Sequence, residues 1–273
     1  MSKIEWTRND DGTEGKTWNP LAGCSIVSPG CTNCYAMRMA ARIERMQPAS
    51  HYKGLTKQVN GNPVWTGKIA RAPDHIFTAP LKWRKPTRVF VNSMSDLFHE
   101  DVPDEWVDQI FAIMAQCPQH VFQILTKRPA RMRAWCIENV LLPLPNVWLG
   151  VSTEDQARAD ERIPLLLDTP AAVRFISAEP LLGPLDMAKY LTRRRVVDAA
   201  GDVDDDWSQK VLDWVIAGGE SGPGKRLINM EWMRDIRDQC KAANVPLFVK
   251  QIDKVIPIPA DLAIREWPKE SRY

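Results

Sequence analysis

Three of the six cysteines in this 273-residue sequence fall within eleven residues, and thiols in that arrangement can bind a metal. Cys24 is followed after six residues by Cys31, and Cys31 and Cys34 form a Cys-x-x-Cys pair. Pro29-Gly30 directly before Cys31 predicts a turn that folds the loop back on itself. One metal ion or cluster could therefore take all three thiolates.

The number of cysteines favours an iron-sulfur cluster over zinc. Three thiolates are one short of a closed structural zinc site, and the nearest histidine, His51, does not follow at zinc-finger spacing. A [4Fe-4S] cluster held by three cysteines leaves one iron free to bind a small molecule. We expect such a cluster, with a zinc site and an incidental or redox thiol group as alternatives. The other cysteines are expected to be buried, metal-free thiols within helical segments: Cys117, Cys136 and Cys240.

Composition and charge are those of a soluble globular chain. Hydrophobic residues make up 44% and charged residues 26%, and no apolar run is long enough to span a membrane. The N-terminus lacks the apolar core of a signal peptide, so we expect a cytoplasmic protein with no membrane partner. The net charge is only +2, so a nucleic-acid partner would need a local basic patch.

The elements that must position these groups alternate between β-rich runs and amphipathic stretches from residue 88 onward, a pattern typical of parallel strands joined by helices. The predicted strands span residues 88–93, 121–126, 146–152, 173–178, 212–217 and 246–250. The predicted helices span residues 104–115, 130–139, 154–167 and 229–243. With a short run at residues 16–20, the pattern predicts an α/β fold, a partial (β/α) barrel of about six parallel strands. A closed barrel and a flavodoxin-like open sheet are the alternatives.

We expect one (β/α) barrel-type domain over residues 1–273, with a cysteine loop at residues 18–36 and two insertions. The first insertion, residues 47–87, is rich in proline and is predicted to be an ordered excursion. The second, residues 193–210, carries an arginine run followed by four aspartates and is predicted to be a solvated, mobile loop. Its charged residues are Arg193, Arg194, Arg195, Asp202, Asp204, Asp205 and Asp206.

Polar side chains follow nearly every predicted strand. Because the carboxyl ends of parallel strands form the functional face of α/β folds, we expect these groups to converge. The sets are Asn92, Ser93, Ser95 and Asp96; Thr126, Lys127 and Arg128; Ser152, Thr153, Glu154 and Asp155; Ser177 and Glu179; and Glu220 and Ser221.

Some of these polar groups also have structural interpretations. Asp96 could be a local cap, and Glu154 and Asp155 suit the first turn of a helix. Glu179 follows an apolar strand, where an ionised carboxylate needs a partner, so a functional role is favoured there. The glycine-rich stretch around Glu220 could bring the backbone close to an anion or a ribose.

Two basic segments could track a nucleic-acid backbone, with a merely solubilising surface as the alternative. The first contains Lys82, Arg84, Lys85 and Arg88, and the second contains Lys127, Arg128, Arg131 and Arg133. Of the eleven tryptophans, Trp65 and Trp83 are candidates to stack on a base, and the rest are expected to be core or partly buried anchors.

A three-cysteine loop ahead of repeated βα units resembles the radical S-adenosylmethionine enzymes, and the motifs more closely resemble a phage-associated three-cysteine-motif family. The cysteines here have six and two intervening residues, where most such enzymes have three and two, and an aromatic residue, Tyr35, follows the third cysteine. The motifs that carry the resemblance are Trp18-Asn19-Pro20, Ser28-Pro29-Gly30-Cys31, Cys34-Tyr35-Ala36, Asn92 to His99, Leu125 to Pro129, Ala178 to Pro184 and Gly218 to Gly222.

This resemblance implies a [4Fe-4S] cluster and S-adenosylmethionine as cofactors, a 5′-deoxyadenosyl radical and an external electron donor. It implies that residues 92–96 hold the amino group of S-adenosylmethionine and that Ser152 and Glu154 face its ribose or carboxylate. Lys127 is a candidate partner for a carboxylate or phosphate, and Glu179 and Glu220 are left for the substrate. We assign Glu179, Glu220 and Lys127 to catalysis.

The association with phage genomes implies a hypermodified thymine in phage DNA as the substrate, carrying an amino-acid adduct that is modified or isomerised in the host cytoplasm. Two alternatives stay open. One is a non-enzymatic protein, stapled by zinc or a cluster, that binds nucleic acid or a partner protein. The other is a lyase that repairs pyrimidine lesions.

Overall fold

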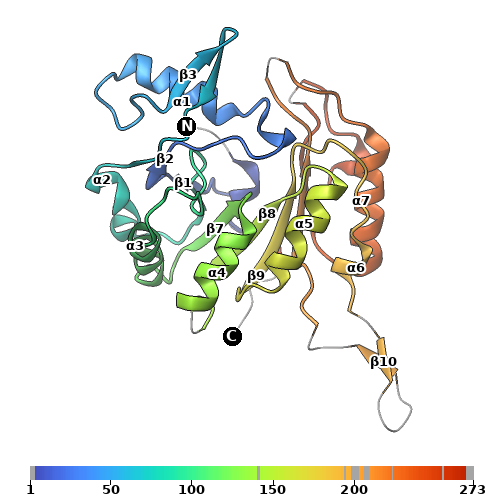
Figure 1. Cartoon of the computed structure of the whole chain (residues 1–273). Coiled ribbons are helices and arrows are strands. Elements are labelled where there is room, and N and C mark those ends of the chain that lie inside the picture. Colours follow the sequence, from blue (N-terminus) through green and yellow to red (C-terminus); the bar gives the residue numbers. More distant parts are fainter. Residues whose placement is uncertain are drawn as a thin grey trace.

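Seven parallel strands form one curled sheet in the order β1-β6-β7-β8-β9-β12-β13 (Figure 1). The computed structural model describes residues 4–139, 142–193, 195–197, 203–205, 209–222, 224–253 and 255–268. The strands are β1 (Lys16–Trp18), β6 (Arg88–Val91), β7 (Val121–Thr126), β8 (Val147–Ser152), β9 (Val173–Ala178), β12 (Trp214–Gly218) and β13 (Leu247–Gln251). Within the described ranges β1 and β13 are the edges of the sheet, so it is a half-barrel and not a closed barrel.

The expected partial barrel of parallel strands is confirmed, with seven strands where about six were predicted. The seventh is β1, which corresponds to the short run predicted at residues 16–20 and pairs with residues 89–91 of β6. Two predicted strands, residues 121–126 and 173–178, have the bounds of β7 and β9, because each is a mostly buried run between turns.

Helices cover the outer, convex face of the sheet (Figure 1). They are α3 (Asp104–Ala115), α4 (Pro129–Asn139), α5 (Gln156–Leu167), the short α6 (Ala188–Leu191) and α7 (Met230–Ala243). Helix α5 starts two residues later than predicted, because the Asp155 carboxylate accepts a hydrogen bond from the Arg158 backbone and caps it. Helix α7 ends at Asn244, whose left-handed backbone (φ 53°) closes the last turn.

The cysteines outside the loop are buried, as expected. Cys136 lies in α4 and Cys240 in α7, and each is 1% exposed. Cys117 is equally buried, but it lies two residues beyond the end of α3 and not within a helix, so that part of the prediction was wrong.

The inner, concave face of the sheet has two layers. Near the amino ends of the strands, large apolar side chains fill the space: Trp6, Phe90, Trp148, Val173, Phe175, Trp214, Ile216 and Phe248. Near the carboxyl ends, the inward positions of β8, β9 and β12 hold Ser152, Ser177 and Gly218. Because inward side chains alternate along a strand, this change in size leaves the carboxyl half open above an aromatic floor.

The floor is closed from below by both ends of the described chain. The short 3-10 helix η1 (Glu5–Thr7) inserts Trp6, whose ring packs edge-on against Phe90 with centroids 4.7 Å apart. The indole of Trp267 donates a hydrogen bond of 2.8 Å to the carbonyl of Trp6. Segments 261 residues apart in the sequence therefore complete one layer.

The first insertion is an ordered excursion, as predicted, but it contains elements that the sequence did not reveal. Strands β3 (Thr56–Val59) and β4 (Asn62–Trp65) form a hairpin packed on α1 (Tyr35–Met46). Its two-residue turn, Asn60-Gly61, has positive φ at both positions (49° and 76°), as such a turn requires. Further along lie β5 (Ala70–Arg71), which pairs with β2 (Leu21–Ala22), α2 (Asp74–Phe77) and η3 (Ala79–Lys82).

The second insertion contains an antiparallel pair of strands, β10 (Arg195–Val197) and β11 (Val203–Asp205), where a mobile loop was expected. Of the charged residues predicted there, Arg194, Asp202 and Asp206 lie outside the described residues. Two further 3-10 turns complete the secondary structure, η2 (Pro29–Cys31) and η4 (Ala260–Leu262). In the described segments no helix is both long and apolar enough to cross a membrane.

Candidate functional site

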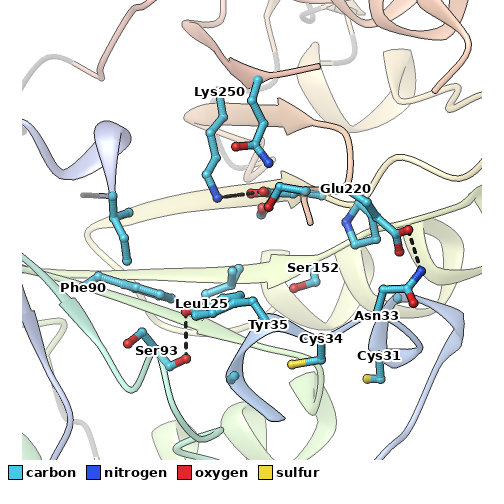
Figure 2. Close-up of a pocket in the computed structure, with 18 of the residues that line it drawn as sticks. Cys31, Asn33, Cys34, Tyr35, Phe90, Ser93, Leu125, Ser152, Glu220 and Lys250 are labelled. Atoms are coloured by element: carbon cyan, nitrogen blue, oxygen red, sulfur yellow. Dashed lines mark hydrogen bonds and ion pairs between the residues drawn. The ribbon is translucent and has the colours of Figure 1, made fainter. Parts of the chain in front are cut away.

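A cavity of about 1230 Å³ opens at the carboxyl ends of the strands, above the aromatic floor. Figure 2 shows the cysteine loop along one side of it and the residues of the sheet along the other. The predicted site residues that line the cavity are Cys24, Cys31, Cys34, Asn92, Ser93, Ser95, Asp96, Lys127, Ser152, Glu179 and Glu220. Glu154 does not line the cavity.

The three thiols of the loop are half-buried and face the same cavity. The Arg128 guanidinium donates to Cys24 Sγ at 3.7 Å, and Ser28 Oγ lies 3.9 Å from Cys31 Sγ. Burial, reinforced by the Asp96 carboxylate, raises the pKa of the Cys24 thiol to about 12. A positive centre near these thiols would be needed to favour thiolates.

The donor set, three thiols that face one cavity, is compatible in its chemistry with the expected iron-sulfur cluster. Among the described residues no three His, Cys, Asp or Glu side chains are gathered closely enough to hold one metal ion. In an iron-sulfur cluster each cysteine binds a different iron, so the ligand sulfurs can be spread more widely than around one zinc.

Glu154 braces the cysteine loop from behind. Its side chain is fully buried, one carboxylate oxygen lies 3.1 Å from Arg162 Nη1, and the other accepts from the Gly30 backbone at 3.3 Å. Gly30 fits there because it has no side chain: a Cβ would stand 3.1 Å from the carboxylate. Burial opposes ionisation, but Lys127 and Arg162 hold the pKa of Glu154 below its ordinary value. Glu154 was expected to face the cofactor, but it does not line the cavity, and its carboxylate instead positions the loop.

Glu220 braces the opposite side of the loop. Its carboxylate accepts from Asn33 Nδ2 at 2.8 Å and from the Arg226 backbone at 2.8 Å, and it pairs with the Arg226 guanidinium. Burial raises the pKa of Glu220, but the bonds from Arg226 and Asn33 outweigh it and keep the carboxyl ionised. Glu220 lines the cavity with its hydrogen-bonding capacity largely taken, which fits positioning better than catalysis.

Asp96 ties the end of β6 to the end of β7. Its carboxylate accepts from Thr126 Oγ1 at 2.6 Å, from the Lys127 backbone at 3.0 Å and from Arg128 Nη1 at 3.0 Å. Arg128 in turn pairs with Glu100 and bonds Ser25 and Cys24. The chain of contacts fixes the Cys24 end of the loop to two strands of the sheet.

Three groups at the cavity have unused capacity to donate hydrogen bonds. Asn92 Nδ2 and Ser95 Oγ are buried and have no partner within the part of the chain that the structure describes. Lys127 Nζ donates to Ser152 Oγ at 3.1 Å and has no carboxylate within 4 Å in those same ranges. Buried polar groups without partners are costly, so these donors suit a ligand with acceptor oxygens.

Glu179 has the partner that its position demanded. Lys250 Nζ, on β13, contacts both of its carboxylate oxygens, at 2.7 and 2.8 Å, and each side chain is 19% exposed towards the cavity (Figure 2). Sequence reasoning missed Lys250 as a site residue. The signal was there, because Lys250 shares the inward face of β13 with Phe248.

Tyr35 was also missed. Its ring projects into the cavity and its hydroxyl donates to the Ser93 carbonyl at 2.8 Å (Figure 2). The hydroxyl of Ser93 in turn donates to Asn19 Oδ1 at 3.0 Å. Tyr35 therefore links the cysteine loop to the segment that follows β6.

Neither predicted basic patch exists as expected. In the first, Arg88 is 4% exposed and pairs with Asp10, because it is the start of β6. Only Lys82, Arg84 and Lys85 are exposed, and they precede β6 at the amino ends of the strands, away from the cavity. In the second, carboxylates from other segments of the same chain neutralise three of the four cations. The pairs are Arg128 with Asp96 and Glu100, Arg131 with Asp104, and Arg133 with Asp168.

The two candidate stacking tryptophans differ in position. Trp65 is 6% exposed and contributes its small accessible edge to the cavity wall. Trp83 is half-buried against His120, with ring centroids 5.8 Å apart, and lies outside the cavity. Neither presents an open ring face to solvent.

The chain belongs to the family described as protein of unknown function DUF5131, whose sequence profile matches residues 1–262. No curated protein and no solved structure matches the chain.

Proposed function

We propose that this chain is a radical S-adenosylmethionine enzyme that isomerises an amino-acid adduct on a thymine of phage DNA. The proposal assigns Cys24, Cys31 and Cys34 to a [4Fe-4S] cluster and S-adenosylmethionine to the cavity. The observation that supports it most is that three thiols line one cavity at the carboxyl end of a parallel half-barrel, together with Lys127 and with Asn92 and Ser95, whose buried donor atoms have no partner among the described residues.

Once bound and reduced by an external donor, the cluster with S-adenosylmethionine supplies a 5′-deoxyadenosyl radical that removes a hydrogen atom from the substrate. The protein contributes position and charge. Arg128 brings a cation to Cys24, and Glu154 and Glu220 hold the loop from two sides. A charge-assisted bond to sulfur favours the thiolate that metal binding requires.

The free donors match the oxygen atoms of S-adenosylmethionine. Its carboxylate would suit the Lys127 ammonium, which lacks a carboxylate partner among the described residues. Asn92 Nδ2 and Ser95 Oγ, both unpartnered, can donate to the same carboxylate or to the ribose hydroxyls. This keeps residues 92–96 as cofactor-binding residues but gives them the carboxylate or ribose in place of the predicted amino group, and it moves Glu154 out of the binding set.

The Glu179–Lys250 pair suits the amino-acid part of the substrate. An amino-acid adduct carries a carboxylate and an amine, so Lys250 would bind the first and Glu179 the second. The base must leave the DNA stack to reach this wall, and the cavity volume is large enough for a cofactor together with a flipped nucleotide. The aromatic floor excludes water from below.

Iron analysis tests the cofactor. Protein prepared anaerobically should be brown and carry iron and labile sulfide, and Cys→Ala changes at positions 24, 31 and 34 should abolish both. The matched control changes the three buried cysteines, 117, 136 and 240, and should keep the cluster. One tight zinc per chain with no iron uptake on reconstitution would refute the radical mechanism.

Product analysis tests the reaction. With a strong reductant and S-adenosylmethionine, the reconstituted protein should release 5′-deoxyadenosine. Adduct-bearing phage DNA should yield, after digestion to nucleosides, an isomer of unchanged mass and altered retention time. Conversion of a pyrimidine photodimer in place of the adduct would favour the repair lyase, and no cleavage by an intact reduced cluster in the presence of substrate would exclude the enzyme class.

A further inference from the structure

Positive charge is concentrated in residues 35–72. This segment has seven Lys and Arg side chains and one acidic residue, Glu44, a net charge of +6 in a chain whose total is +2. Arg71 pairs with Asp74. The other six cations have no carboxylate within 4 Å in the described ranges. Arg38 is half-buried, and the rest are exposed: Arg42, Arg45, Lys53, Lys57 and Lys68.

These cations belong to one structural unit, α1 with the β3–β4 hairpin, which we call the basic unit. A small core holds it together, formed by Ala36, Met37, Ala40, Tyr52, Leu55 and Trp65 with Ala22 and Met94 of the neighbouring loops. In Figure 1 the unit stands above the sheet, at the upper left. It is therefore a fixed part of the fold and not a charged tail.

The basic unit forms one wall of the cavity, and its cations continue that wall outward. Tyr35 and Met39 line the cavity, and Arg42 follows them at helical spacing, so the three share one face of α1. Arg45 lies one turn further along the same face. A backbone bound along α1 would thus lead directly to the cavity mouth.

The exposed hairpin adds groups that read nucleic acids. Gln58, Asn60 and Asn62 at its tip are exposed amides, which can donate to and accept from base edges or sugars, while Lys57 offers a phosphate contact. A two-stranded ribbon fits the major groove of DNA. A protein partner would instead require an apolar patch at the centre of the contact. Of the large apolar side chains exposed on the described basic unit, Tyr35 and Met39 belong to the cavity wall, which leaves only Met46 and Val59 outside it.

We propose that the basic unit holds the phosphate backbone of the nucleic acid whose target nucleotide enters the cavity. This inference rests on the proposed function, which requires a nucleic-acid substrate. The basic unit replaces the two patches expected from the sequence. Most cations of the patch at residues 127–133 are neutralised by carboxylates, and the patch at residues 82–88 lies at the opposite end of the sheet.

Two charge-reversal variants of equal charge change test it. The first is Arg42→Glu/Arg45→Glu/Lys57→Glu, and the matched control is Lys82→Glu/Arg84→Glu/Lys85→Glu. The probe is a short fluorescein-labelled DNA duplex, with the corresponding single strand measured in parallel, titrated at several salt concentrations. Neither variant touches the cavity, so both should cleave S-adenosylmethionine without DNA at the wild-type rate.

The basic-unit variant should bind DNA at least tenfold more weakly, and the slope of log K against log salt should fall by about 3 because about three phosphate contacts are lost. The control should stay within about twofold of wild type. Equal losses in both variants, or loss in the control alone, would overturn the inference. The inference would also be overturned if the basic-unit variant bound DNA normally and lost turnover only when the electron came from a protein donor and not from a chemical reductant. That result would mean that the basic unit binds the electron-donor protein. If the wild type cleaves S-adenosylmethionine but binds no DNA, the nucleic-acid substrate of the proposed function fails as well.

Discussion

Replacing Glu154 by Gln should weaken the whole fold and the cysteine loop together. The change keeps the shape of the side chain but leaves the Arg162 guanidinium, 2% exposed, without its carboxylate. Removing one partner of a buried pair costs about 3 to 5 kcal/mol. For a chain of this size each kcal/mol lowers Tm by about 2 to 4 °C, so the cluster-free protein should melt roughly 10 °C below wild type.

The second effect is local. Glu154 also accepts hydrogen bonds from the Gly30 backbone and from Ser28, on either side of Pro29 and directly before Cys31. A neutral amide accepts more weakly than a carboxylate, so the loop should hold its thiols less firmly and iron content after reconstitution should fall. S-adenosylmethionine affinity per intact cluster should change little, because Glu154 lies outside the cavity.

The assay combines thermal and guanidinium unfolding of the cluster-free form with iron and sulfide analysis after anaerobic reconstitution. A Glu154→Leu/Arg162→Met variant separates the two effects, since a hydrophobic pair should recover most of the stability but not the contact with Gly30. Stability within about 1 kcal/mol of wild type for Glu154→Gln would contradict the role of the buried pair. Full iron content with a raised Kd for S-adenosylmethionine would restore Glu154 as a cofactor ligand.

Three further changes give separate outcomes. Lys127→Met removes the one proposed cofactor-binding cation, which has no carboxylate within 4 Å among the described residues. S-adenosylmethionine binding, measured by calorimetry, should weaken about 10- to 100-fold at unchanged iron content. An unchanged Kd would contradict this role. Burial raises the pKa of Asp213, so the folded state is penalised as the pH rises above the ordinary value of 3.8; Asp213→Asn should therefore melt higher than wild type at pH 7, and the gain should vanish in acid. Gly150→Ala would place a Cβ 2.5 Å from the Phe175 ring and should cost about 1 to 3 kcal/mol in guanidinium unfolding, whereas wild-type stability would mean that the floor is loosely packed.

Much of the sheet and its helices could be predicted because their signals are local. A run such as residues 121–126 is mostly apolar, and α3 begins and ends at the predicted residues, 104 and 115. The hairpin β3–β4 was missed because half of its strand residues are polar and only Trp65 is buried, with little alternation to mark a strand.

The candidate site was predicted less completely because its charges are settled by contacts that only the folded chain reveals. Strand-end position correctly brought eight of nine predicted residues to one cavity, which the three cysteines predicted from their spacing also line. It could not tell which carboxylates were already in use: Glu154 is neutralised by Arg162, and Glu179 meets a lysine 71 residues later. The basic run at residues 127–133 failed for the same reason, since its carboxylate partners lie on other segments.

The aromatic floor also has a consequence for how the chain folds during synthesis. Trp6 packs against Trp214, and its carbonyl is bonded by Trp267, so the layer is assembled from segments that leave the ribosome far apart in time. At about 5 to 20 residues per second, Trp6 waits roughly 13 to 50 s for Trp267 to emerge. Closing the floor is thus one of the last events of folding, and until then a row of aromatic rings on the nascent sheet stays exposed to chaperones and to other chains.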